Sequence, residues 1–147
     1  FFCEKLGQSL EQVSKLIPKQ DLSSETTSRI LNIRAKYSFT SKVYASDGTK
    51  WTVIFSDTEK GIAEPCFGRT IFVRRIESVF DITMHVKDQH QSVGLAVNNS
   101  DKRRLAEIFT KKGIDRCPDI GSMSLYELPW DGIFPMNKMI RWSSFYD

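Results

Sequence analysis

A tight turn that leads directly into a strand, at residues 64–76, is the feature that most restricts how this chain can fold. The segment reads Glu-Pro-Cys-Phe-Gly-Arg-Thr-Ile-Phe-Val-Arg-Arg-Ile. Proline and glycine close together are typical of a turn, and the β-branched and aromatic run after them is typical of a strand. Ligands of open α/β sheets bind in loops at strand ends. The sequence therefore predicts a functional turn at Glu64–Arg69, at the edge of a sheet.

Helices and strands alternate after this turn. The sequence predicts a helix over residues 78–87, a strand over 92–98, a helix over 101–112 and a short strand over 114–117. This alternation is typical of βαβ units. We therefore expect an α/β fold with a mostly parallel sheet that is flanked by helices.

Two helices and a hairpin are predicted before the turn. Apolar residues recur at three- and four-residue steps from Phe2 to Ile17, where Pro18 ends the first helix. A second helix runs from the capping residues around Ser23 to about Tyr37. Asp-Gly between two apolar runs then predicts a β-hairpin near residues 42–55.

Length and charge limit the class of protein. The 147 residues suit a single domain over residues 1–147, and no apolar run is long enough to span a membrane. The net charge of +3 is small and evenly spread, so nucleic acid is not an expected partner. Three widely spaced cysteines, an odd number without Cys-x-x-Cys, favour a reducing, cytoplasmic compartment.

The residues taken alone supply no convincing catalytic centre. Cys3 is expected to be a small buried residue of the first helix, and Cys66 a buried neighbour of Phe67. His85 and His90 are five residues apart, which is the wrong spacing for a zinc helix, so no metal site is expected. No glycine-rich phosphate loop is present, so the phosphate-binding part of any nucleotide site would lie outside this chain.

Residues 118–135 form a long segment in which aromatic and aliphatic side chains alternate with glycine and proline. Long loops of this kind are more often functional than not in compact domains. A short helix or strand is expected after it, over residues 136–142.

The order of these motifs resembles the C-terminal part of the aldehyde dehydrogenase superfamily. Residues 64–69 correspond to that family's Glu-Glu-x-Phe-Gly-Pro turn, and residues 92–96, Ser-Val-Gly-Leu-Ala, to its following strand. Within that superfamily, the sequence shows a closer similarity to the acyl-CoA reductases of the bioluminescence (lux) type. It rests on residues 45–53, 67–70, 89–94 and 113–116, and on the tail through Gly121-Ser122-Met123, Asp131-Gly132 and Ile140-Arg141-Trp142.

This resemblance implies a two-step reduction of a fatty acyl-CoA or acyl-protein thioester to the aldehyde. A cysteine thiolate forms a thioacyl enzyme, and NADPH supplies hydride. The family's nucleophile precedes the helix that corresponds to residues 1–17. The resemblance therefore implies that this chain is a C-terminal segment without a catalytic residue, inactive alone. Its partner would be the remainder of the same enzyme; homo-oligomerisation is left open.

The same resemblance assigns residues to the site. Phe67 and Gly68 correspond to the rim of the cofactor site, where the aromatic ring packs near the nicotinamide. Trp130, Asp131 and Gly132 correspond to the substrate wall. The alternative is a module that has lost catalysis and binds a protein partner through the aromatic residues between Leu125 and Phe134.

Overall fold

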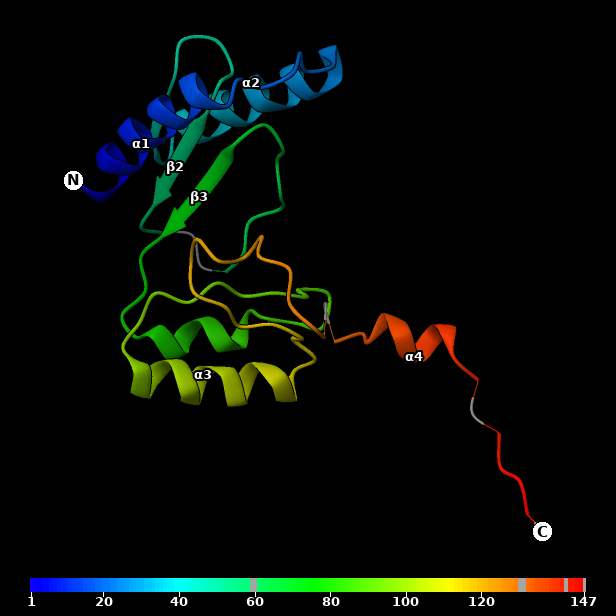
Figure 1. Cartoon of the computed structure of the whole chain (residues 1–147). Helices are drawn as coiled ribbons and strands as arrows, with labels where there is room; N and C mark the ends of the chain where they lie inside the picture. Colours follow the sequence, from blue (N-terminus) through cyan, green and yellow to red (C-terminus); the bar gives the residue numbers. More distant parts are fainter. Residues whose placement is uncertain (59–60, 130–131, 142, 147) are drawn as a thin grey trace. The chain divides into compact units, whose positions relative to one another are not determined.

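The computed structural model describes residues 1–58, 61–129, 132–141 and 143–146. The chain divides into two compact units, Phe1–Glu77 (unit 1) and Ser78–Asp147 (unit 2). Figure 1 colours the chain from the N-terminus to the C-terminus and labels most of its helices and strands.

Unit 1 contains a three-stranded mixed sheet in the order β1-β2-β3. The strands are β1 (Lys42–Ala45), β2 (Thr52–Ser56) and β3 (Thr70–Arg74). β1 pairs antiparallel with β2, and β2 pairs parallel with β3. The prediction of a mostly parallel sheet is therefore wrong, because the first two strands are joined as a hairpin and a hairpin makes its strands antiparallel.

The hairpin predicted near residues 42–55 is confirmed. Its loop, residues 46–51, contains Gly48 with a φ of 68°, a left-handed conformation that glycine adopts without strain. The backbone N–H of Ser46 donates to the carbonyl oxygen of Trp51 over 3.3 Å and closes the loop. The Asp-Gly pair therefore acts as predicted.

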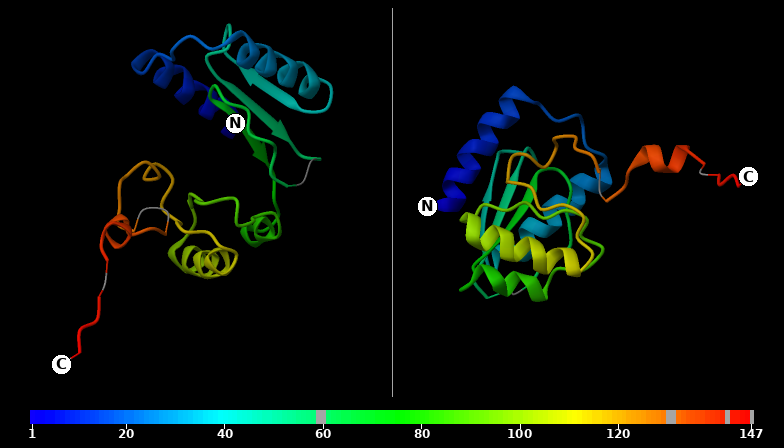
Figure 2. Two further views of the ribbon diagram at one scale, coloured as in Figure 1. Left: turned by 90° about the vertical axis from the view of Figure 1, so that its right-hand side faces the viewer. Right: turned by 60° about the horizontal axis from the view of Figure 1, so that its bottom comes forward.

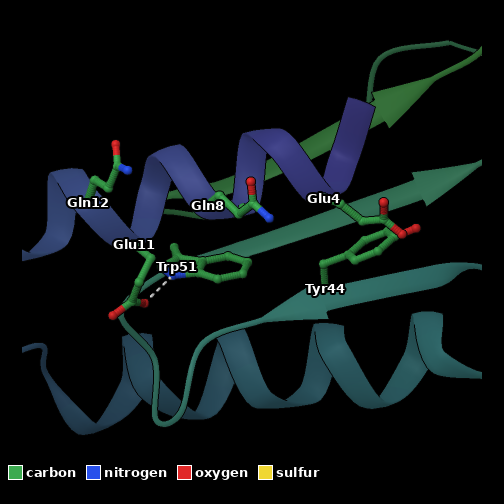
Figure 3. A pocket seen from close by; sticks show the side chains of 7 residues that line it. Glu4, Gln8, Glu11, Gln12, Tyr44 and Trp51 are labelled. Atoms are coloured by element: carbon green, nitrogen blue, oxygen red, sulfur yellow. Dashed lines mark hydrogen bonds between the residues drawn. The ribbon is translucent and has the colours of Figure 1, made fainter. Parts of the chain in front are cut away.

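The two predicted helices of unit 1 are present, and they cover opposite faces of the sheet. α1 (Phe2–Leu16) packs Cys3 against Trp51 and Val53 on one face. α2 (Ser24–Ser38) contacts the other face, where the ring of Tyr37 meets that of Phe72 edge to face. Each strand can contact both helices because successive strand residues point to opposite faces of the sheet. Figure 3 shows the strands between the two helices.

Unit 2 is built around α3 (Asn99–Lys111), which begins at the N-cap Asn98. Its core consists of Val86, Leu95, Leu105, Phe109 and Ile114. α3 lies beside η1 (Val79–Met84), as both views of Figure 2 show. The helix predicted over residues 101–112 is confirmed, with its start two residues earlier.

The helix predicted over residues 78–87 is wrong in type and length. The structure has a 3-10 helix from Val79 to Met84, which begins with a capping box formed by Ser78 and Asp81. Val79, Ile82 and Thr83 are β-branched, and β-branched residues are less favourable in an α-helix. The capping signal was present in the sequence, but the segment after it favours only a short turn.

The two strands predicted at residues 92–98 and 114–117 are reduced to isolated parallel bridges between Ser92 and Arg116 and between Leu95 and Asp119. The two segments therefore run parallel to each other, as predicted, but they do not form extended strands. The N–H of Leu95 donates to the carbonyl oxygen of Pro118 over 2.8 Å. Because proline has no N–H, Pro118 cannot extend the ladder.

Residues beyond 120 are mostly exposed in the part of the chain that the structure describes. α4 (Pro135–Met139) is one short helix without buried residues, so the segment after Pro135 contains a helix rather than a strand. No helix among the described residues has the length and hydrophobicity required to cross a bilayer.

Candidate cofactor rim at the 64–69 turn

The 64–69 turn directly precedes β3 and has an unusual backbone. Gly68 and Arg69 are both left-handed, with φ values of 75° and 56°. The side chain of Cys66 is buried, whereas Phe67 is 73% exposed. The turn is therefore anchored through Cys66 and presents the ring of Phe67 outward, where a ligand can reach it.

Gly68 is required by the protein's own packing. A Cβ at this position would lie 2.6 Å from Cδ1 of the fully buried Ile30 and 3.2 Å from Nζ of Lys19. The side on which a side chain would project is thus filled by α2 and by the connection that precedes it. Packing and the positive φ explain this glycine without a ligand, and the cofactor role assigned to it stays a prediction.

The 64–69 turn is attached to the helices by basic side chains. Arg69 donates from Nη2 to the carbonyl oxygen of Ile17 over 2.6 Å and from Nη1 to Oγ of Ser14 over 3.2 Å. Arg29 donates to the Glu64 carboxylate over 2.8 Å. The contact between Arg29 and Glu64 is an exposed ion pair, and such pairs contribute little to stability, about 0–1 kcal/mol. The contacts of Arg69 therefore matter more for the position of the turn.

The 46–51 loop lies next to the 64–69 turn because the two segments precede parallel strands whose first residues, Thr52 and Thr70, are paired. Arg34 of α2 holds this loop through three hydrogen bonds. It donates to the carbonyl oxygens of Gly48 and Trp51 over 2.7 and 3.0 Å, and to Oγ1 of Thr52 over 2.8 Å. Burial lowers the pKa of the Arg34 guanidinium.

Lys19 connects the 46–51 loop and the 64–69 turn. Its ammonium donates to the carbonyl oxygens of Thr49 over 2.6 Å and of Gly68 over 2.9 Å. Burial lowers the pKa of Lys19, and the nearby positive charges of Arg69 and Arg34 lower it further. Sequence analysis missed Lys19 and Arg34, because no local pattern shows which carbonyl groups a basic side chain will reach.

The residues assigned to the substrate wall are less fully described. Trp130 and Asp131 lie outside the described residues. Gly132 is in unit 2 with a φ of 73°, and a Cβ there would lie 2.5 Å from Oδ1 of Asp115. Phe67 and Gly68 belong to unit 1. The cofactor-rim and substrate-wall roles assigned to these residues stay predictions.

The three cysteines are free thiols. Burial raises the pKa of Cys3, outweighing the opposite effect of the N-terminal ammonium, and burial also raises the pKa of Cys117. The thiolate is the nucleophilic form of cysteine, so neither environment activates the thiol. Cys3 and Cys66 are both buried, as predicted. The described residues include no group of three or more His, Cys, Asp or Glu side chains that could hold a metal ion.

A groove that sequence analysis missed lies between α1 and the β-hairpin (Figure 3), with a volume of about 550 Å³. Trp51 and Tyr44 contribute its aromatic side chains, and Nε1 of Trp51 donates to Oε2 of Glu11 over 2.8 Å. The polar residues of α1 that line it are Glu4, Gln8, Glu11 and Gln12. Their three- and four-residue spacing is visible in the sequence, but the opposing strand residues are not.

Comparison with known protein families shows the family to which the chain belongs. The family model described as acyl-CoA reductase (LuxC) matches residues 2–142. The chain belongs to the LuxC acyl-CoA reductase family. A comparison with curated proteins gave no match. The family is named for reduction of acyl-CoA, and the similarity to lux-type reductases expected from the motifs is thereby confirmed at the level of the family.

Proposed function

We propose that this LuxC-family chain is the C-terminal segment of an acyl-CoA reductase with the aldehyde dehydrogenase fold. The observation that carries the proposal is the family match over residues 2–142, almost the whole chain. Residues 1–147 would then form one part of the catalytic domain, and the nucleotide-binding half and the nucleophile would lie elsewhere in the enzyme.

The proposed reaction has two steps. A cysteine thiolate outside this chain attacks the carbonyl carbon of a fatty acyl-CoA or acyl-protein thioester, and the thiol of that thioester departs. The product is a thioacyl enzyme. NADPH supplies the hydride that releases the aldehyde and regenerates the cysteine thiolate. Water must be excluded in between, because hydrolysis of the thioacyl group would give the acid instead of the aldehyde.

The role of this segment is to provide the cofactor rim and part of the substrate wall. The exposed ring of Phe67 fits a role as the surface against which the nicotinamide packs. Trp130, Asp131 and Gly132 would line the path of the acyl chain. The raised pKa values of the Cys3 and Cys117 thiols support a nucleophile outside this chain. The mild net charge and the free cysteines support a cytoplasmic enzyme that does not bind nucleic acid.

The 147-residue chain alone is expected to be inactive. Purified chain, incubated with a long-chain acyl-CoA and NADPH, should give no NADPH oxidation above the rate without protein, because the proposed nucleophile lies outside it. The full-length reductase from the same gene, assayed in parallel, is the positive control. Thioester-dependent turnover by the chain alone would contradict the proposal.

A second candidate function is protein binding through unit 2. Five apolar side chains between residues 125 and 134 are at least half exposed: Leu125, Tyr126, Leu128, Ile133 and Phe134. Exposed apolar patches with polar rims often mark protein interaction sites. This observation favours a module that uses the aromatic segment to hold a partner, including another copy of the chain.

Substitution of Phe134 and Trp130 by alanine separates the two functions. In an interaction module, the double variant should lose partner binding in a pull-down while its thermal unfolding is unchanged, because a half-exposed side chain such as Phe134 contributes little to the core. In the reductase, the same substitutions should reduce the activity of the full-length enzyme. Phe145→Ala, at an exposed aromatic residue outside the segment, is the matched control.

A further inference from the structure

The Phe67 ring can serve as a cofactor rim only if the 64–69 turn is held still, yet most of that turn has no regular secondary structure. Residues 62–66 lie outside helices and strands. The consecutive left-handed residues Gly68 and Arg69 then reverse the chain before β3 begins at Thr70. Left-handed residues other than glycine are strained by about 1–2 kcal/mol, so such a turn needs contacts that hold it.

Two hydrogen-bonded connections run in opposite directions between this turn and the chain just after α1. Arg69 reaches back to the carbonyl oxygen of Ile17, and Lys19 reaches forward to the carbonyl oxygen of Gly68. Pro18, between Ile17 and Lys19, restricts its own φ and limits how the connection can move. The two connections are therefore made at either side of a proline, where the backbone has restricted freedom.

Lys19 differs from Arg69 because its contact is with the backbone adjacent to Phe67. The bond from Nζ to the carbonyl oxygen of Gly68 is 2.9 Å long, and the same ammonium also holds Thr49 of the 46–51 loop at 2.6 Å. Hydrogen bonds from a charged donor are about twice as strong as neutral ones. One side chain thus joins the two neighbouring segments at this edge of the sheet, one residue from the ring.

We propose that Lys19 is a positioning residue of the reductase, which fixes the Phe67 ring for hydride transfer by holding the carbonyl group of Gly68. The role rests on the proposed function of the 64–69 turn as the cofactor rim. Lys19 acts through the backbone of the turn and takes no part in the attack on the thioester. Its loss should therefore affect the second step of the reaction and leave the first unchanged.

The test uses the full-length reductase with Lys19→Met, which keeps an unbranched side chain of similar length and removes the charged donor. Acylation of the enzyme by acyl-CoA is measured without NADPH, and hydride transfer is measured by adding NADPH to the acylated enzyme. Hydride transfer should fall at least about tenfold, because small misplacements of reacting groups cost large factors in rate. Acylation should be unchanged, and Lys19→Arg should restore much of the rate.

Hydrogen–deuterium exchange reports the movement directly. Lys19→Met should increase exchange in residues 64–69 and 46–51. Arg34→Gln is the matched control, since among the described residues the Arg34 side chain donates to the 46–51 loop and to the start of β2. That variant should increase exchange in the 46–51 loop and leave hydride transfer unchanged. If Lys19→Met does not fold, Lys19→Gln replaces it in both experiments, because glutamine removes the charge and keeps an amide donor.

Phe67→Ala distinguishes failure of the inference from failure of the proposed function. If Phe67→Ala slows hydride transfer and Lys19→Met does not, the turn is a cofactor rim but Lys19 does not position it. If Lys19→Met slows acylation as much as hydride transfer, its role is general stability and the inference is overturned. If neither variant affects hydride transfer, the turn is not the cofactor rim, and the role of Lys19 is rejected with it.

Discussion

Replacement of Gly68 by alanine is expected to destabilise the chain by about 2–4 kcal/mol. Strain in the left-handed backbone and overpacking both destabilise the folded chain. The smaller conformational entropy of alanine in the unfolded chain offsets part of that loss. The new Cβ would stand 2.6 Å from Cδ1 of Ile30, which is fully buried and cannot move into solvent. The backbone φ of 75° adds strain. Urea unfolding of the 147-residue chain measures the loss.

Gly48→Ala is the matched control for this substitution. Gly48 has a similar φ of 68°, but no atom lies within 4 Å of the position a Cβ would take. Alanine at this position would therefore have the left-handed backbone strain without a steric contact. We expect Gly48→Ala to lower the free energy of unfolding by about 1 kcal/mol or less, once the smaller unfolded-state entropy of alanine is included. Equal losses at the two glycines would show that contact with Ile30 is unimportant.

The double variant Gly68→Ala with Ile30→Val tests the contact itself, because valine lacks the Cδ1 atom that a Cβ at residue 68 would meet. Ile30→Val alone should cost about 0.5–1.5 kcal/mol, as is usual for a buried methyl group. Together the two substitutions should cost less than the sum of the single losses, because residues in contact are energetically coupled. Strict additivity would contradict the packing explanation for Gly68.

The parts of the fold that the sequence predicted well depend on local signals. The apolar spacing that ends at Pro18, the Ser23 cap and the Asp47-Gly48 pair each act within a few residues, and the structure has the two helices and the hairpin they predict. The expectation of a mostly parallel sheet was wrong because the strands predicted at residues 92–98 and 114–117 form only isolated bridges, so the antiparallel hairpin is one of the two strand pairings in the sheet. Local patterns do not specify how separate strands pair.

The candidate site was predictable only in part, for the same reason. Turn chemistry identified residues 64–69, and the burial of Cys66 and the exposure of Phe67 fit a turn that presents an aromatic ring. The side chains that hold the turn, Lys19 and Arg69, are about fifty residues apart in sequence, with a separation of 49 residues between Lys19 and Gly68. Such contacts follow from the packing of α1, α2 and β3, and a single sequence does not reveal them.

Phe109→Ala in α3 is expected to cost about 3–5 kcal/mol, the usual loss for truncation of a fully buried phenylalanine. The side chain has 0% exposure and packs with Leu95, Leu105 and Ile114 in the core of unit 2. The helix ends just after this residue, where the N–H of Ile114 donates to the carbonyl oxygen of Phe109 over 3.1 Å. Loss of the ring would leave a cavity beneath that turn.

Thr110→Ala, at the next residue of the same helix, is the control. Thr110 is exposed, and its hydroxyl donates only to the carbonyl oxygen of Ala106 within the helix, so its loss should change stability by less than about 0.5 kcal/mol. Thermal unfolding followed by circular dichroism at 222 nm, which is dominated by helix, compares the two variants. A similar small effect at both positions would show that Phe109 is not a core residue of α3. A large effect at Phe109 alone would identify its ring as a central part of the core of unit 2.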